Sequence, residues 1–277
     1  MNSGKLDKEM ISQPELWRLA LIVSADRLDV ALYPPLTREE IIWRSFAFDP
    51  DAPSQLRAIE DIIYANPLLL SDFKRVDCII DNAVAMPLPA ALTPADAETV
   101  YRAATADAPA DADIELYPTA DCLTAIALMQ QPDISAFFRR TFYNVRFDSR
   151  MAALARFFIN RSDAPAGPMV YAISRSRRLT LIAVSGQRLL MANNFTFQAD
   201  ADAAYYILAS MQTLGLDPLA TPLALNADSA ETRAGIAGML KPYVTEITSI
   251  PLPALRYRAT KATFEAPIDL LIRPLCE

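Results

Sequence analysis

The chain has 277 residues, of which 52% are hydrophobic and 21% charged, and its formal net charge is −7. This length is enough for two packed domains or one large one. The negative charge disfavours nucleic-acid binding, which depends on cations that neutralise phosphates. Because the sequence contains no histidine, it excludes histidine-based triads, imidazole metal ligands and histidine acid/base catalysis.

The sequence predicts a soluble, cytoplasmic protein without a membrane span. No apolar run approaches the roughly 20 residues that a spanning helix needs, and the first ten residues, MNSGKLDKEM, contain no apolar signal core. The cysteines, Cys78, Cys122 and Cys276, are odd in number and widely spaced, which excludes a disulfide framework and a paired-cysteine zinc site. Cys78 and Cys122 lie in apolar runs that predict strands, so we expect buried, reduced thiols. We expect no metal site and no cofactor.

The first predicted elements are strands at 16–24, 27–33 and 41–48, where apolar, aromatic and β-branched residues alternate with polar ones. Only Ala25 and Asp26 separate the first two strands, which indicates a hairpin. A helix follows at 54–66, with Ser54 as its N-cap, and then a buried strand at 76–81.

The same order of elements returns in the second half of the chain. Strands are predicted at 168–174, 179–185 and 188–197, then a helix at 201–214 and a strand at 222–226. Between the halves, the sequence predicts an exposed helix and a solvated loop within 95–113, strands at 111–117 and 122–128, and helices at 134–142 and 150–159. The repetition indicates an internally duplicated α/β fold. The segment 163–168 is a plausible boundary, so we predict lobe one at 1–165 and lobe two at 166–277.

A resemblance to a known family rests mainly on the segment after residue 192. Asn193-Asn194-Phe195, then Asp200 or Asp202, then Tyr205-Tyr206-Ile207-Leu208, resembles a pattern in a family of uncharacterised Bacteroidetes proteins, classed as a domain of unknown function. The closing Leu275-Cys276-Glu277 also fits, and the resemblance covers essentially the whole chain in length and element order. The family's fold resembles that of the actin-like ATPases (ribonuclease H-like), in which two similar α/β lobes flank a cleft. The resemblance brings no established activity with it.

The actin-like fold implies two turns that face nucleotide phosphates, one between the first two strands of each lobe, and glycine lets their backbone N–H groups approach. The turn 24–27 has Asp26 but no glycine, and an aspartate there is either a metal-placing group or an ordinary turn residue. The turn 174–178, SRSRR, has neither glycine nor an acid. Gly235 and Gly238 could form an adenosine-binding loop, although a helix that contains both glycines is the preferred interpretation. The chain is therefore predicted to be a degenerate, non-hydrolysing member of the fold.

The arginine turn is a second candidate site, made of Arg175, Arg177 and Arg178, with Arg188 on the next turn. Guanidinium groups bind phosphate or carboxylate bidentately. The cluster is therefore either an anion site, a docking point for an acidic partner, or a solvated hairpin tip.

The segment 189–211 is interpreted as a strand-to-helix joint. Asp200 is the expected N-cap, and Asn193 and Asn194 are expected to hold loop backbone. Tyr206 points away from the apolar stripe of the helix, toward another element or the cleft. The candidate cleft residues are therefore Asp26, Asn194, Tyr206, Gly235 and Gly238.

The function that the sequence favours is a non-catalytic pseudo-ATPase that acts as a protein-interaction module with an as yet unidentified protein partner and no catalytic residues. One alternative is a nucleotide-binding actin-like ATPase or kinase that uses Asp26. A second is an accessory protein in RNA modification that uses SRSRR with Arg256, Arg258 and Lys261, which the acidic net charge disfavours.

Overall fold

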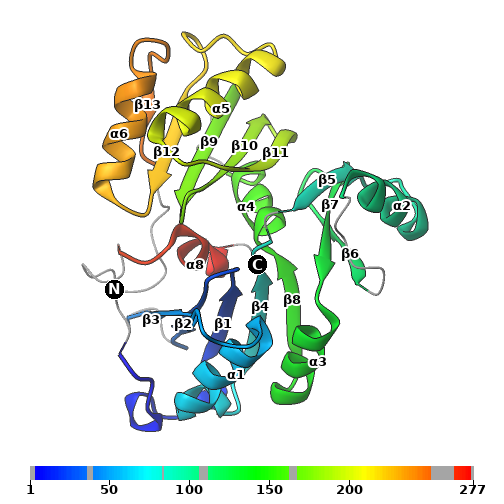
Figure 1. Ribbon diagram of the computed structural model, residues 1–277, viewed down its shortest axis with the longest axis vertical. Helices are drawn as coiled ribbons and strands as arrows, with labels where there is room; N and C mark the ends of the chain where they lie inside the picture. The colour runs from blue at the N-terminus through cyan, green and yellow to red at the C-terminus, as the bar shows by residue number, and fades with distance from the viewer. Residues whose placement is uncertain are drawn as a thin grey trace.

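The computed structural model describes residues 4–35, 40–82, 84–105, 112–161, 167–250 and 265–275. The predicted lobe boundary and the residues Arg256, Arg258, Lys261, Cys276 and Glu277 lie outside these ranges. Across the described residues the strands form three sheets, which Figure 1 shows with short helices between and around them.

The first sheet has the strand order β3-β2-β1-β4-β8. Its strands are β1 (Arg18–Val23), β2 (Arg27–Tyr33), β3 (Ile42–Ala47), β4 (Arg75–Ile80) and β8 (Val145–Ser149). Strands β1, β4 and β8 are parallel, whereas β2 and β3 run antiparallel beside β1. Helices α1 (Gln55–Ala65) and α3 (Pro132–Thr141) bury apolar side chains against one face, in a core that includes Ile59, Ile63 and Phe138. Ser54 caps α1 by accepting from the Arg57 N–H, as predicted.

The second sheet repeats this arrangement, with the order β11-β10-β9-β12-β13. Its strands are β9 (Pro168–Arg175), β10 (Arg178–Ser185), β11 (Arg188–Thr196), β12 (Leu223–Ala227) and β13 (Ile247–Thr248). Helices α5 (Asp200–Thr213) and α6 (Ala230–Leu240) pack on one face, around Ile207, Met211 and Ile236. In both sheets the first strand lies between an antiparallel second strand and a parallel fourth one. The predicted duplication is therefore confirmed.

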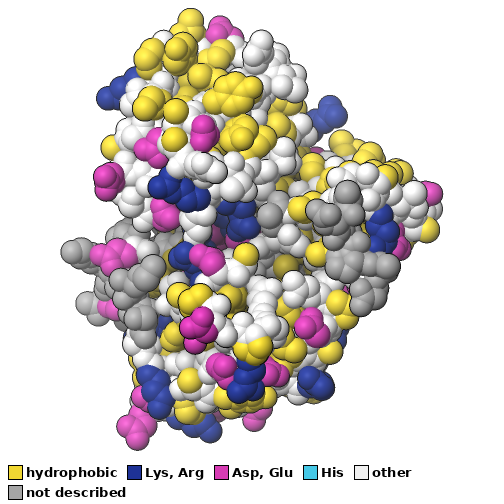
Figure 2. All heavy atoms as spheres, viewed as in Figure 1, with side chains coloured by type: hydrophobic (Ala, Val, Ile, Leu, Met, Phe, Trp, Pro, Cys, Tyr) yellow, Lys and Arg dark blue, Asp and Glu magenta, His cyan; other side chains and the backbone are white. Residues whose placement is uncertain are grey.

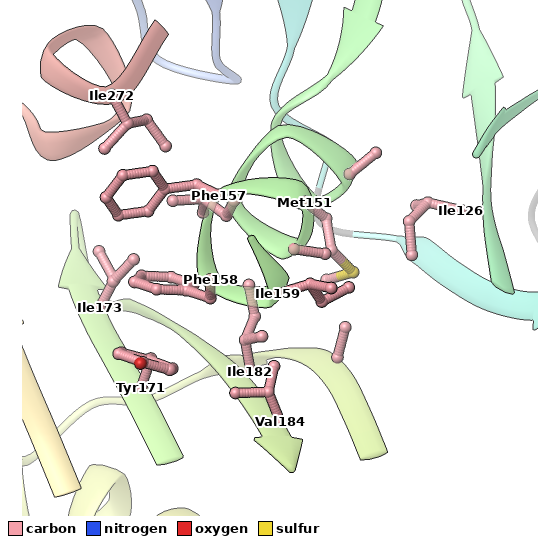
Figure 3. Close-up of a cluster of buried hydrophobic side chains, with 14 of the residues drawn as sticks. Ile126, Met151, Phe157, Phe158, Ile159, Tyr171, Ile173, Ile182, Val184 and Ile272 are labelled. Atoms are coloured by element: carbon pink, nitrogen blue, oxygen red, sulfur yellow. The ribbon is translucent and has the colours of Figure 1, made fainter. Parts of the chain in front are cut away.

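Two helices lie between the sheets, α4 (Arg150–Ile159) and α8 (Ile268–Ile272). Figure 3 shows α4 against β9 and β10, where the Phe158 ring stacks on Tyr171 with 3.8 Å between centroids. Helix α8 contributes Ile272 to that core, while Leu270 and Leu271 pack on the opposite side against β1 and β2. Helix α8 therefore contacts both sheets.

A third sheet stands beside the other two, with the order β5-β7-β6. It consists of β5 (Ala85–Pro89), β6 (Asp113–Pro118) and β7 (Thr124–Gln130), covered by α2 (Pro94–Ala104), which buries Tyr101. Short 3-10 turns complete the described chain: η1 (Lys8–Met10), η2 (Pro14–Leu16), η3 (Pro67–Leu70) and η4 (Arg273–Leu275). Strands β5 and β8 were not predicted from the sequence. Both are only five residues long, and proline or charged residues interrupt their apolar pattern.

Two local predictions are wrong. Cys122 is exposed, in a turn before β7 with φ of 58°, whereas Cys78 is buried in β4 as expected. Asp200 is the first residue of α5 rather than its N-cap, a position held by Ala199. The Asp202 carboxylate instead accepts from the backbone N–H groups of Gln198 and Ala199, because a side chain at the third helical position can reach back to the residues before the helix. None of the described helices is both long and apolar enough to cross a membrane.

Candidate functional site

The candidate site is a buried ionic network between the two large sheets. Among the described residues, its cations are Arg150 of α4 and two arginines of the β9–β10 hairpin. Its anions are two aspartates that line the first sheet and one of α8. Its members are Asp29, Asp81, Asp269, Arg150, Arg175 and Arg178. The formal charges of these six side chains cancel.

Arg175, at the end of β9, reaches across to the first sheet. Its Nη2 donates to Asp29 Oδ2 at 2.5 Å, and its Nη1 lies 3.6 Å from Asp269 Oδ2. The Asp29 side chain is 0% exposed, although it lies in the middle of β2. A buried carboxylate requires a partner of opposite charge, and Arg175 supplies that partner from the other sheet.

Arg150 opens α4 and lies at the centre of the network. Its side chain is 4% exposed, with Nε 3.0 Å from Asp269 Oδ2 and Nη1 3.8 Å from Asp81 Oδ1. Burial alone would lower the pKa of Arg150, but the carboxylates of Asp269 and Asp81 outweigh it and raise that pKa. Arg150 therefore remains a cation inside the protein.

Arg178, the first residue of β10, pairs with Asp81, which follows β4. Ser24 also donates to that carboxylate, at 3.1 Å. Burial lowers the pKa of Arg178, the Asp81 carboxylate opposes this effect, and the neighbouring Arg150 charge adds to it. The turn between β9 and β10 is thus tied to the end of β4.

A second chain of ion pairs runs along the face of the first sheet that α8 covers. Arg273, just after α8, lies 3.2 Å from Asp77 and 2.5 Å from Asp148. Asp77 also pairs with Arg75, and Asp148 with Arg156 of α4. Burial lowers the pKa of Arg273, but Asp148 and Asp77 outweigh it and raise that pKa. These pairs fix the C-terminal helix to the sheet.

The structure separates the predicted arginine cluster. Arg175 and Arg178 point inward into the network, whereas Arg177 and Arg188 are exposed. Arg177 and Ser176 form the tip of the β9–β10 turn with positive φ of 59° and 48°, a turn type that usually takes asparagine and glycine. Arg177 donates to the Gln198 carbonyl.

Asp26 lies in the β1–β2 turn and pairs with the adjacent Arg27 at 2.7 Å. That hydrogen bond lowers the pKa of Asp26, against the effect of burial, and Arg175 contributes a smaller effect in the same direction. Asp26 is therefore close to the network without belonging to its ion pairs. No group of three Cys, Asp or Glu side chains in the described chain is placed to hold a metal ion.

Asn194 is connected to the network through Thr180. The Thr180 hydroxyl accepts from Arg150 at 2.7 Å and donates to Asn194 Oδ1 at 2.7 Å, and Asn194 Nδ2 lies 3.3 Å from the Asn82 carbonyl. Asn194 thus links β11 to the segment after β4. Tyr206 lies elsewhere, with its ring stacked on Phe195 at 4.7 Å, so it meets another element, one of the two expected positions.

The glycine pair lies in α6, as the preferred interpretation held. A Cβ atom on Gly235 would lie 1.9 Å from Asp200 Oδ2, whereas one on Gly238 would meet nothing within 4 Å. A side chain at position 235 would therefore require the Asp200 carboxylate to move.

Sequence reasoning missed the acids of the network, Asp29, Asp81 and Asp269, and also Arg150. A signal was present, because Asp29 alternates with Arg27, Ala31 and Tyr33 on one face of an otherwise apolar strand. Arg150 likewise begins a helix whose other residues are nearly all buried. A charged residue in such a place indicates a buried partner.

Comparisons with solved structures define the fold class. A Bacteroides thetaiotaomicron protein described as having an actin-like ATPase fold and unknown function superposes with a TM-score of 0.82 and 17% identity, covering 99% of this chain and 100% of that one. A chain of the PilM-PilN type IV pilus biogenesis complex gives a TM-score of 0.50 and 12% identity, over 94% and 96% of the two chains. The AlfA filament protein from a Bacillus subtilis plasmid gives 0.46 and 9%, over 93% and 98%.

The protein therefore has the duplicated actin-like ATPase fold, as predicted. The chain belongs to the family described as protein of unknown function DUF3822, whose model matches residues 7–247. The search of curated proteins found no match.

Proposed function

We propose that this protein is a non-catalytic, degenerate actin-like protein, a pseudo-ATPase, that acts as a protein-interaction module. The observation that carries the proposal is the pairing of Arg175 and Arg178 with Asp29 and Asp81. The actin-like resemblance implies that nucleotide phosphates lie between the two hairpin turns. In this protein the arginines beside one turn bind carboxylates of the facing sheet instead.

A phosphate entering this region would have to displace a buried carboxylate from its arginine. Breaking a buried ion pair by removing one partner destabilises a protein by about 3–5 kcal/mol. The displaced carboxylate, Asp29 or Asp81, would also repel the phosphate. The network therefore opposes nucleotide binding both by occupying the arginines and by its own negative charge.

The backbone of the two turns supports the same proposal. In the β9–β10 turn the Ser176 N–H donates to the Asp228 carboxylate at 3.0 Å. In the β1–β2 turn the Ser24 N–H donates to the Arg27 carbonyl at 3.0 Å. Phosphate-binding turns present free N–H groups to the ligand, and these two groups are already used.

Exposed side chains provide surfaces for a protein partner. Figure 2 shows hydrophobic side chains gathered around α5 and α6, where Tyr205 is 66% and Met239 52% exposed. Arg177 and Arg188 are exposed at the two turns that flank β10. Tyrosine, methionine and arginine are the residue types that protein interfaces favour. The proposal keeps the lobes at 1–165 and 166–277, since β1 to β8 precede this boundary and β9 to β13 follow it.

The nucleotide half of the proposal is tested by isothermal titration calorimetry with Mg-ATP. We expect no saturable binding at the hairpin turns at millimolar nucleotide. Binding that is lost in Asp26→Ala, a variant of an exposed residue that should leave the fold intact, would overturn the proposal in favour of a nucleotide-binding ATPase or kinase.

The partner half is tested by purification of the tagged chain from its native host. We expect a stoichiometric protein that is retained by the parent chain and reduced in Arg177→Ala or Tyr205→Ala. Tyr143→Ala is the matched control, because Tyr143 is 84% exposed in the loop before β8. A parent chain that purifies without any stoichiometric protein would contradict the interaction module.

A further inference from the structure

Three aromatic side chains meet at the surface where β11 lies beside α5. The Phe195 ring stacks on the Tyr206 ring, with 4.7 Å between their centroids, and Tyr205 meets Tyr206 edge to face at 5.7 Å. Tyr205 is 66% exposed, and Phe195 and Tyr206 are half-buried. Figure 2 shows this part of the surface, where hydrophobic side chains gather. We call Phe195, Tyr205 and Tyr206 the aromatic cluster.

The packing of α5 does not account for its exposed tyrosine. The buried residues of this helix are Ala203, Ala204, Ile207, Ser210 and Met211. Because successive helical residues point about 100° apart, Tyr205 points away from that stripe. Exposed apolar groups that gather into a patch rimmed by polar residues mark interaction sites. The aromatic cluster is therefore a candidate contact surface.

A carboxylate lies beside the aromatic cluster. Asp202 precedes Tyr205 and Tyr206 by three and four residues on α5, the spacings at which side chains are neighbours on a helix. Its Oδ2 accepts from the backbone N–H groups of Ala199 and Gln198, and these bonds lower the pKa of Asp202. The carboxylate therefore stays charged at neutral pH.

The elements around the aromatic cluster are rich in acids. Arg177 reaches this region from the β9–β10 turn and donates to the Gln198 carbonyl, so one cation stands against Asp200 and Asp202 at the start of α5. Residues 189–232, which include all of α5, contain no lysine or arginine but do contain Asp200, Asp202, Asp217, Asp228 and Glu231. A partner with complementary charge would be basic.

An aromatic surface beside a carboxylate suits a cationic side chain. The face of a tyrosine or phenylalanine ring attracts a guanidinium or ammonium group within about 6 Å of its centroid, and arginine also stacks on such rings. The chain itself contains this arrangement, since the Arg139 guanidinium lies 4.8 Å from the centroid of Phe147. A carboxylate next to the ring can form a charge-assisted hydrogen bond with the same cation.

We propose that the aromatic cluster and Asp202 bind an arginine or lysine side chain in a basic segment of a partner protein. This inference rests on the proposed function, because it names the partner chemistry of the interaction module. A basic partner is favoured over a second copy of this chain, whose net charge of −7 would make two copies repel one another.

The test is a selection of phage-displayed random dodecapeptides on the full chain, with counter-selection on the Asp202→Asn/Tyr205→Ala double variant. We expect the enriched peptides to share an arginine or lysine. A synthetic copy of the most enriched peptide is then titrated with the chain by fluorescence anisotropy. Binding should weaken with added salt, and citrulline in place of the peptide's arginine, or norleucine in place of its lysine, should abolish it, because each replacement removes the charge.

Single variants assign the contributions of the ring and of the charge. Tyr205→Ala should bind the peptide about tenfold more weakly, whereas Tyr205→Phe keeps the ring and most of the affinity. Asp202→Asn keeps an acceptor oxygen for the N–H groups before α5, so it should fold normally while it weakens binding and reduces the effect of salt. Tyr143→Ala and Glu15→Gln each remove an exposed group elsewhere and should bind like the parent, and thermal melting checks every variant.

Three results would overturn the proposal. The first is a selection that enriches no peptides or enriches peptides without a shared cation. The second is unchanged affinity in both Tyr205→Ala and Asp202→Asn. The third is a parent chain that sediments as a dimer and a Tyr205→Ala variant that sediments as a monomer, which would assign this surface to a second copy.

Failure of this inference is distinguishable from failure of the interaction module. A stoichiometric native partner that Tyr205→Ala and Asp202→Asn retain as well as the parent would overturn the aromatic cluster as its binding surface and leave the module standing. A parent chain that purifies from its host without any stoichiometric protein would contradict the module, and the inference with it.

Discussion

The two ends of the first sheet differ in how deeply their arginines are buried. At the carboxyl ends of β1 and β4, Arg150 and Arg178 are buried and share Asp81 as a partner. At the amino ends, Arg18 and Arg75 begin the neighbouring strands and are only partly buried, and Arg75 pairs with Asp77. Burial, rather than residue type, therefore distinguishes the two ends. The carboxyl end, where the charges of the ionic network cancel, is called the balanced end, and it is the end at which the actin-like resemblance implies nucleotide.

The largest effect is expected at the balanced end. Arg150→Ala leaves Asp81 and Asp269 buried without their central cation, so the free energy of unfolding should fall by about 3–5 kcal/mol. Arg146→Ala, its counterpart near the amino ends of the strands, removes an exposed charge and should change the free energy of unfolding by no more than about 0.5 kcal/mol. Urea denaturation of the two variants measures both free energies of unfolding. Equal losses in the two variants would contradict the difference between the two ends.

The connection between the sheets can be measured separately. Asp29→Ala and Arg175→Ala should each destabilise the protein, and a double-mutant cycle should give a coupling energy of about 0.5–3 kcal/mol, the range for residues in direct contact. An additive double variant would mean that this ion pair does not couple the β9–β10 hairpin to the first sheet.

Much of the fold, but little of the network, is predictable from the sequence. Alternating strands such as 27–33 and the repeated element order identify the duplicated α/β architecture. Asp29 is visible as a charged residue within a strand, but its partner Arg175 is 146 positions away along the chain. Such a pairing depends on how the sheets pack, and a single sequence does not record it. The pairing of Arg273 with Asp77 and Asp148 is hidden for the same reason, because these residues meet only when α8 packs on the first sheet.

The glycines of α6 test the nucleotide interpretation in another part of the second lobe, since Gly235 and Gly238 were the candidates for an adenosine-binding loop. Gly238→Ala should stabilise the protein by about 0.5–1 kcal/mol, because alanine is the better helix former and no atom lies near its Cβ. Gly235→Ala should lose this gain because its Cβ meets the Asp200 carboxylate. Thermal unfolding compares the two, and Asp200→Ala should restore the gain at Gly235. Equal stabilisation by both substitutions would rule out a packing role for Gly235.

The smallest effect concerns Asp26. The hydrogen bond from Arg27 holds the pKa of Asp26 below its usual range, so its stabilising contribution is complete above the ordinary carboxyl pKa of about 3.9 and is lost as the pH falls through the lowered value. Asp26→Asn should therefore melt slightly earlier than the parent at neutral pH, and the two melting temperatures should converge in acid. A difference that grows in acid would contradict this assignment.

The most direct measurement is isothermal titration calorimetry of Mg-ATP into the parent chain and into Asp26→Ala. The account predicts no saturable binding to the parent at millimolar nucleotide, because Arg175 and Arg178 are occupied by the Asp29 and Asp81 carboxylates. Saturable Mg-ATP binding to the parent that is lost in Asp26→Ala would contradict the central claim that buried ion pairs have replaced the nucleotide site.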